Sequence, residues 1–105
     1  SYTGFQHMDV NPVVTVRGTI VDAESKVGIG FALIHHLVDE ERRPVSQTDL
    51  AGNYVLHLGY SLPEHEFYEI AREGYASVTV ELPHDAQQVD SRTLVLNLSL
   101  DPIEN

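Results

Sequence analysis

The sequence predicts an all-β fold, an antiparallel Greek-key sandwich of seven strands. Apolar and polar residues alternate with a period of two along most of the chain, turn residues recur at short intervals, and no segment has the period of a helix. The 105 residues fit one ordinary domain, because two cores in so short a chain would each be marginal. We expect the sandwich over residues 13–101, a leader with little order over 1–12 and a tail over 102–105.

The first two strands are predicted from their apolar positions. Residues 14–22 carry apolar side chains at alternate positions, which is typical of a strand with one buried face. A glycine-containing turn over residues 23–30 follows. Residues 31–38 are almost wholly apolar apart from His35 and His36, and they have the length of a strand.

A charged segment precedes a predicted hairpin. Residues 39–44 contain five consecutive charges and a proline, which favours a solvated turn because unpaired charges are costly to bury. Short strands are expected over 45–48 and 53–58, joined by a tight turn at 49–52 in which Asp can bond nearby amides and Gly can take a positive φ. This spacing predicts a β-hairpin.

The second half of the chain predicts three further strands. Residues 59–66 are irregular and read as a surface loop. Strands are expected over 67–72 and 75–82, joined by Glu73-Gly74. A polar, turn-rich segment at 83–91 leads to a last strand over 92–100, in which leucines occupy every second position from Leu94.

The charge of the chain excludes several classes of partner. Sixteen acidic and six basic side chains give a formal charge of −10, which disfavours nucleic acids and anionic membrane surfaces. No apolar run approaches the roughly 20 residues of a membrane-spanning helix. The absence of cysteine removes disulfides, thiolate catalysis and Cys-ligated zinc. We expect no cofactor.

Four motifs follow one another in an order that is more specific than any one of them. They are V-R-G-T-I-V-D at 16–22, G-F-A-L-I at 30–34, T-D-L-A-G-N-Y-V-L at 48–56 and E-G-Y at 73–75. This order resembles that of the carboxypeptidase regulatory-like domain family, whose pattern runs V-x-G-x-V-x-D, G-A-x-V, T-D-x-x-G-x-Y and G-Y. The resemblance spans about residues 13–100 and implies a transthyretin-like (prealbumin-like) sandwich.

The residues that carry the resemblance have structural roles. A mid-strand glycine lets a facing group approach closely, Asp and Gly build the hairpin turn, and a tyrosine on an inward face can bury its ring while its hydroxyl finds a partner. The motif residues are Gly18, Asp22, Asp49, Gly52, Tyr54, Gly74 and Tyr75. The chain departs from the family pattern at 26–30, which lacks a proline, and at 59–66, where the loop is longer and more acidic.

Histidines are the first candidates for chemistry. Neighbours on a strand project to opposite faces, so His35 and His36 cannot chelate one metal together. The family register implies that Ala32, Ile34 and His36 face inward and His35 outward, and the expected role is a satisfied histidine near the end of a core strand. His57 is predicted to face outward on its strand.

Ligand binding has three candidate residues. His65 lies between two glutamates in the irregular loop, and a metal site there would need three or four converging ligands, so we expect no metal. Tyr60 in the same loop is the best placed aromatic platform for a glycan; Tyr2, Phe5 and Tyr68 are the other aromatic candidates. The ligand-binding candidates are therefore His57, Tyr60 and His65.

The sequence contains no sign of a nucleophile elbow, since it has no G-x-S-x-G motif and no predicted helix. The transthyretin-related hydroxyisourate hydrolases carry a C-terminal Tyr-Arg-Gly-Ser motif, whereas residues 101–105 read D-P-I-E-N. We therefore expect no enzyme, and treat a hydrolase as the least favoured alternative.

The family resemblance implies a non-catalytic module of an exported bacterial protein. Such a protein would be periplasmic, attached to the cell surface, for example as a lipoprotein, or secreted. Its expected role is structural, as a spacer, or protein interaction, with an unidentified protein or glycan partner and neighbouring domains. The alternative is a carbohydrate- or peptide-binding module.

Overall fold

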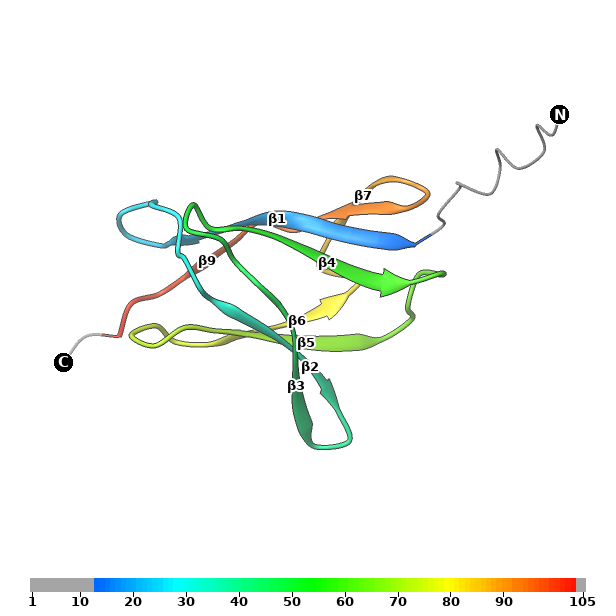
Figure 1. Cartoon of the computed structure of the whole chain (residues 1–105), viewed down its shortest axis with the longest axis horizontal. Helices are drawn as coiled ribbons and strands as arrows, with labels where there is room; N and C mark the ends of the chain where they lie inside the picture. The colour runs from blue at the N-terminus through cyan, green and yellow to red at the C-terminus, as the bar shows by residue number, and fades with distance from the viewer. Residues whose placement is uncertain (1–12, 104–105) are drawn as a thin grey trace, which may run out of the picture.

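The computed structural model describes residues 13–103 and contains two packed β-sheets (Figure 1). The leader predicted over 1–12, with Tyr2 and Phe5, and the end of the predicted tail at 104–105 lie outside the described residues. The strands are β1 (Val14–Asp22), β2 (Leu33–Val38), β3 (Glu41–Gln47), β4 (Asn53–Gly59), β5 (Glu66–Ala71), β6 (Val78–Leu82), β7 (Gln87–Asp90), β8 (Thr93–Val95) and β9 (Leu98–Leu100). The described chain has no helix, and hence none able to span a membrane.

The predicted all-β sandwich is confirmed, with one sheet of mixed direction. The first sheet has the order β4-β1-β8-β7, with β9 also paired to β1, and the second has the order β3-β2-β5-β6. Within the first sheet β1 is antiparallel to β4 and parallel to both β8 and β9. The start of β1 and the segment after β9 consequently lie at opposite ends of the sandwich (Figure 1).

The last predicted strand is divided into β8 and β9, because its pairing with β1 is interrupted between Val95 and Leu98. The Leu96 carbonyl accepts a hydrogen bond from the buried Tyr54 hydroxyl at 2.7 Å. A Cβ on Gly18 would lie 1.9 Å from that carbonyl oxygen, so only glycine leaves room for it. The Leu96 N–H still donates to the Arg17 carbonyl, and regular pairing with β1 resumes at Leu98.

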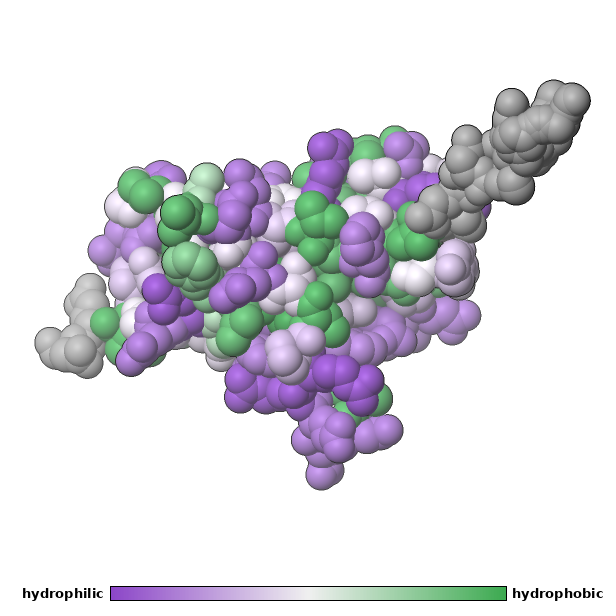
Figure 2. Space-filling view, in the orientation of Figure 1, coloured by the Kyte–Doolittle hydropathy of each residue, from purple (hydrophilic) through white to green (hydrophobic). Residues whose placement is uncertain are grey.

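The turn predicted over 39–44 is shorter than expected. Only Asp39 and Glu40 form the turn, with φ values of 51° and 66°, and β3 begins at Glu41. The prediction was wrong for 41–44 because β3 is an edge strand whose charged side chains stay in water while its backbone pairs with β2. The resulting β2–β3 hairpin extends beyond the sandwich and is mostly hydrophilic (Figures 1 and 2).

The predicted hairpin between 45–48 and 53–58 is wrong. β3 pairs with β2 and β4 pairs with β1, so the connection crosses from one sheet to the other. Its turn is nevertheless built as a tight reversal, because the Asp49 Oδ1 accepts the N–H groups of Ala51 and Asn53 at 3.0 and 2.9 Å. Turn residues therefore indicated a reversal but not which sheet receives the next strand.

One strand lies in a segment that was expected to be a loop. β7 pairs with β8 at the edge of the first sheet, and all four of its residues are exposed. A strand exposed on both faces has no alternation of polarity from which it could be predicted.

The core fills the space between the two sheets. Inward side chains come from alternate positions of β1, β4 and β8 on one side and of β2, β5 and β6 on the other. The fully buried members include Val14, Val16, Ile20, Leu94 and Leu100.

Candidate functional site

The described chain has a cleft where β4, β2 and β5 approach one another beside the irregular loop. Its volume is about 330 Å³. Polar residues line it from both sheets and from the loop, namely His36, His57, Ser61, Glu66 and Tyr68. The loop that was singled out for its length and acidity supplies Ser61 and leads into Glu66.

The pairing of β2 with β5 places His36 over Tyr68. These residues are register partners, so their side chains share the inward face of the sheet. The rings stack with centroids 4.7 Å apart and an angle of 15° between their planes. Burial, and after it the charge of Glu66, raises the pKa of the Tyr68 hydroxyl to about 12, so this hydroxyl remains a proton donor at neutral pH.

The charged group of the cleft is the pair formed by His36 and Glu66. The His36 Nε2 is in direct contact with the Glu66 Oε1. When a neutral His36 imidazole donates a hydrogen bond from Nε2 to the carboxylate, its Nδ1 is left as a hydrogen-bond acceptor. The cleft thus contains an oriented imidazole, a carboxylate and a tyrosine hydroxyl, which can hydrogen-bond a small polar molecule or pass a proton.

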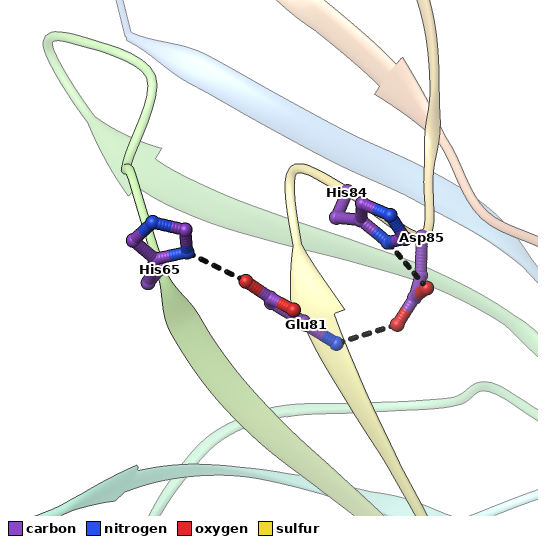
Figure 3. Close-up of polar contacts among 4 residues, drawn as sticks. All are labelled: His65, Glu81, His84 and Asp85. Atoms are coloured by element: carbon purple, nitrogen blue, oxygen red, sulfur yellow. Dashed lines mark hydrogen bonds and ion pairs between the residues drawn. The ribbon is translucent and has the colours of Figure 1, made fainter.

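The three candidate residues do not meet. His57 lines the cleft, and its Nδ1 lies 3.3 Å from the Thr15 Oγ1. Tyr60 is 72% exposed, and it is not among the residues that line the cleft. His65 instead contacts Glu81 on β6, with 2.7 Å between Nδ1 and Oε2 (Figure 3).

His65 belongs to a surface network that includes a turn (Figure 3). The hydrogen bond to Glu81 is the main cause of the raised pKa of His65. Asp85 accepts the Glu81 backbone N–H at 2.7 Å and contacts His84 Nδ1 at 3.1 Å, and its pKa is lowered chiefly by that backbone hydrogen bond. Within residues 13–103, no group of three or more His, Asp or Glu side chains is arranged to hold a metal ion.

His35 occupies an outward position that is nevertheless buried. It is 7% exposed, and its Nδ1 lies 3.9 Å from the Glu69 Oε1 of its register partner. Nδ1 has no hydrogen-bond partner among the described residues, so the prediction of a satisfied histidine is wrong for this atom. The Arg42 Nε lies 3.0 Å from the same Glu69 oxygen and forms an ion pair with it, but Glu69 Oε1, like His35 Nδ1, has no hydrogen-bond partner among the described residues.

The structural motif residues lie in turns and strand crossings. Asp22 accepts the N–H groups of Glu24 and Ser25, and the Tyr75 hydroxyl donates to its other oxygen at 2.8 Å. These bonds, with that from Ser25 first, lower the pKa of Asp22. Gly74 has a φ of 91° in the turn before Tyr75.

Sequence reasoning did not identify Glu66, Tyr68 or Glu69 as partners of the histidines. Each contact depends on the register between β2 and β5, two strands separated by the whole of β3 and β4. The signal that could have found them is the alignment of the two inward faces, once these strands are known to be neighbours.

Comparison with known proteins gives structural neighbours only. No family model matches the chain, and no curated protein matches it. The 3-chlorocatechol 1,2-dioxygenase of Rhodococcus opacus 1CP is similar with a TM-score of 0.62 and 17% identity, over 90% of this chain and 61% of that one. The pilus 2b backbone protein of group B streptococcus is similar with a TM-score of 0.53 and 13% identity, over 85% of this chain and 41% of that one.

These neighbours show a shared fold and correct one expectation. We expected no enzyme because the hydrolase motifs are missing, and this expectation is corrected by the finding that a similar sandwich occurs in an enzyme, a chlorocatechol dioxygenase. At 17% identity the likeness concerns the fold alone and assigns no reaction to this chain. The described chain spans less than two thirds of either neighbour.

Proposed function

We propose that the chain is a load-bearing structural module of a bacterial cell-surface protein. The observation that carries the proposal is the parallel pairing of β1, the first described strand, with β8 and β9, the last two. The start of β1 and the end of β9 therefore lie at opposite ends of the sandwich (Figure 1).

This arrangement loads many hydrogen bonds at once. Tension applied at the start of β1 and beyond β9 slides these strands past one another along their length. Thr15 faces Thr93 on β8, and Ile20 faces Leu98 on β9. The parallel pairing therefore runs along most of β1. Strands loaded in shear must break their bonds together, whereas strands pulled apart from one end lose them one at a time.

Two further observations support the proposal. The pilus backbone protein of group B streptococcus has a similar fold over 85% of this chain. The motif order supports membership of the carboxypeptidase regulatory-like family and, with it, an exported location, neighbouring domains and a protein partner.

Single-molecule force spectroscopy tests the proposal. The chain has no cysteine, so attachment points can be introduced singly. Val13→Cys with Ile103→Cys loads β1 against β9 in shear, whereas Glu24→Cys with Ile103→Cys pulls both strands from their common end. We expect a clearly higher unfolding force for the first pair at the same loading rate. Equal forces in the two geometries would exclude a load-bearing role for the parallel pairing.

A further inference from the structure

A groove runs along the outer face of the first sheet, on the far side of β1 from the core. Two adjoining hollows of about 450 and 440 Å³ form it, and they share Thr19 and Asn97. The outward positions of β1 form its floor, and Asn53 and Val55 of β4 form part of one wall. From Arg17 to Val21 it follows four strand steps, or about 13 Å.

The charge of the groove is opposite to that of the molecule. The chain carries −10 overall and has six basic residues. Two of these, Arg17 and Lys26, are the only charged residues among the described residues that line the groove, and none of the described residues that line it is acidic. Neither forms a salt bridge with another residue of the described chain. Arg17 also acts on Asp90 of β7, whose pKa is lowered mainly by the hydrogen bond from the Arg92 N–H and least by the charge of Arg17.

Hydrogen-bond donors face the groove between these charges. The Thr19 N–H donates to the Asn97 Oδ1 at 2.9 Å, and a backbone N–H can only donate, so this bond fixes the amide with its oxygen toward Thr19. The Thr19 hydroxyl donates to the Asn53 Oδ1 at 2.9 Å in the same way. Neither amide NH₂ group has a partner among the described residues, and both residues line the groove.

The lining favours a glycan over a peptide. The backbone of β1 is paired on both sides, with β4 and with β8 and β9, so an extended peptide cannot add to it as a strand. Over residues 13–103, Tyr54 is the only aromatic residue of the lining, and it is 5% exposed, so no ring of this part of the chain serves as a stacking platform for a neutral sugar. Amides, the hydroxyls of Thr19 and Ser99, and two separated cations instead match hydroxyl and carboxylate groups on one linear molecule.

We propose that this groove binds an acidic oligosaccharide, with Arg17 and Lys26 pairing with uronate carboxylates and the Asn53 and Asn97 amides donating to the sugar between them. The proposal is independent of the load-bearing role, since a spacer domain need not bind a glycan.

Isothermal titration with a short oligogalacturonate tests the proposal, with a neutral oligogalactose and an oligoglutamate of equal length as comparison ligands. We expect binding of the oligogalacturonate alone, at roughly millimolar affinity or tighter, and weaker binding as salt concentration rises. No binding of the oligogalacturonate, or equal binding of the oligoglutamate, would overturn it.

Three variants locate the site. Arg17→Gln and Asn97→Asp should each weaken binding about tenfold. Asn97→Asp keeps an oxygen that accepts the Thr19 N–H, but it replaces the amide donor with a negative charge. Arg43→Gln removes the same charge from β3, in the other sheet, and should leave affinity unchanged. Equal weakening by all three variants would show that net charge, and not the groove, governs binding.

Discussion

Single residues in this domain are constrained by where backbone crosses backbone. Gly52 and Gly59 both have positive φ values, of 89° and 106°, but their surroundings differ. A Cβ on Gly52 would lie 2.5 Å from the Ile20 carbonyl oxygen, whereas none of the described residues lies within 4 Å of the corresponding position at Gly59. The two glycines therefore separate the cost of backbone conformation from the cost of close approach.

Gly52→Ala and Gly59→Ala form a matched pair. We expect Gly59→Ala to lower the free energy of unfolding by about 1 kcal/mol, the cost of the left-handed conformation alone. Gly52→Ala should cost about 3 kcal/mol, because the Ile20 carbonyl must also move. Urea unfolding followed by circular dichroism measures both. Equal costs would show that the turn relaxes without strain.

The surface histidine His65 gives a prediction about pH. Its pKa is raised chiefly by the hydrogen bond to Glu81, so Glu81→Gln should move its NMR titration midpoint down toward the ordinary value of about 6.5. A raised folded-state pKa gives stability that is fully present below the unfolded value and is lost as the pH rises through the folded one. Glu41→Gln, a substitution on β3, should leave the midpoint in place. A midpoint unchanged by Glu81→Gln would contradict the contact.

Among the elements, the β2–β3 hairpin is the one whose turn sequence fits its geometry least well. Its two turn residues, Asp39 and Glu40, both have positive φ, as in a type I′ turn, where Asn-Gly is preferred. The hairpin extends beyond the sandwich, so changes at its tip leave the core contacts untouched (Figure 1).

Replacing this turn should stabilise the domain. Asp39→Asn with Glu40→Gly removes the left-handed strain at Glu40, offset in part by the flexibility of glycine in the unfolded chain. We expect a gain of about 1 kcal/mol and a rise in melting temperature of about 5 °C in calorimetry. Glu40→Val, which places a β-branched residue at the same φ, should lower the melting temperature. A fall in stability with Asn-Gly would mean that the turn adopts another conformation.

At the scale of the whole molecule, buried tyrosines make stability depend on alkaline pH. Burial raises the pKa of Tyr54 above its ordinary value and that of Tyr68 to about 12. The tyrosines of the unfolded chain ionise near pH 10, so above that pH ionisation lowers the free energy of the unfolded state relative to the folded state, and stability falls as pH rises.

Tyr54→Phe tests this alkaline dependence. The variant should be less stable at neutral pH by about 1–3 kcal/mol, because the Leu96 carbonyl loses its partner. Its unfolding free energy should fall less steeply above about pH 10, by up to about 1.4 kcal/mol per pH unit for the one tyrosine removed. Urea titrations at several pH values measure the slope. An unchanged slope would mean that Tyr54 ionises equally readily in both states.

The sequence predicted the sandwich but not its internal order. Alternation located β1, β4 and the inward leucines of the last strand, since burial of one face is a local property of the pattern. It could not assign β3 and β4 to different sheets, because the turn at Asp49 and Gly52 has the same chemistry in either arrangement.

The candidate sites were harder to predict than the fold. His57 was identified and lines a cleft, but its neighbours Glu66 and Tyr68 come from a strand whose register no local pattern reveals. The groove beside Arg17 was missed because its donors are brought together by β1, β4 and the break between β8 and β9. Long-range pairing, which sequence patterns do not encode locally, decides both sites.

The bond from the Tyr54 hydroxyl to the Leu96 carbonyl also affects the order of local unfolding. The last strand of a domain ordinarily frays first, because few contacts hold it. Here the segment between β8 and β9 is tied to β4 across Gly18, so opening it leaves the buried Tyr54 hydroxyl without its hydrogen-bond acceptor. Amide hydrogens of β9 should therefore exchange with solvent as slowly as those of β4, and the two would open as one cooperative unit.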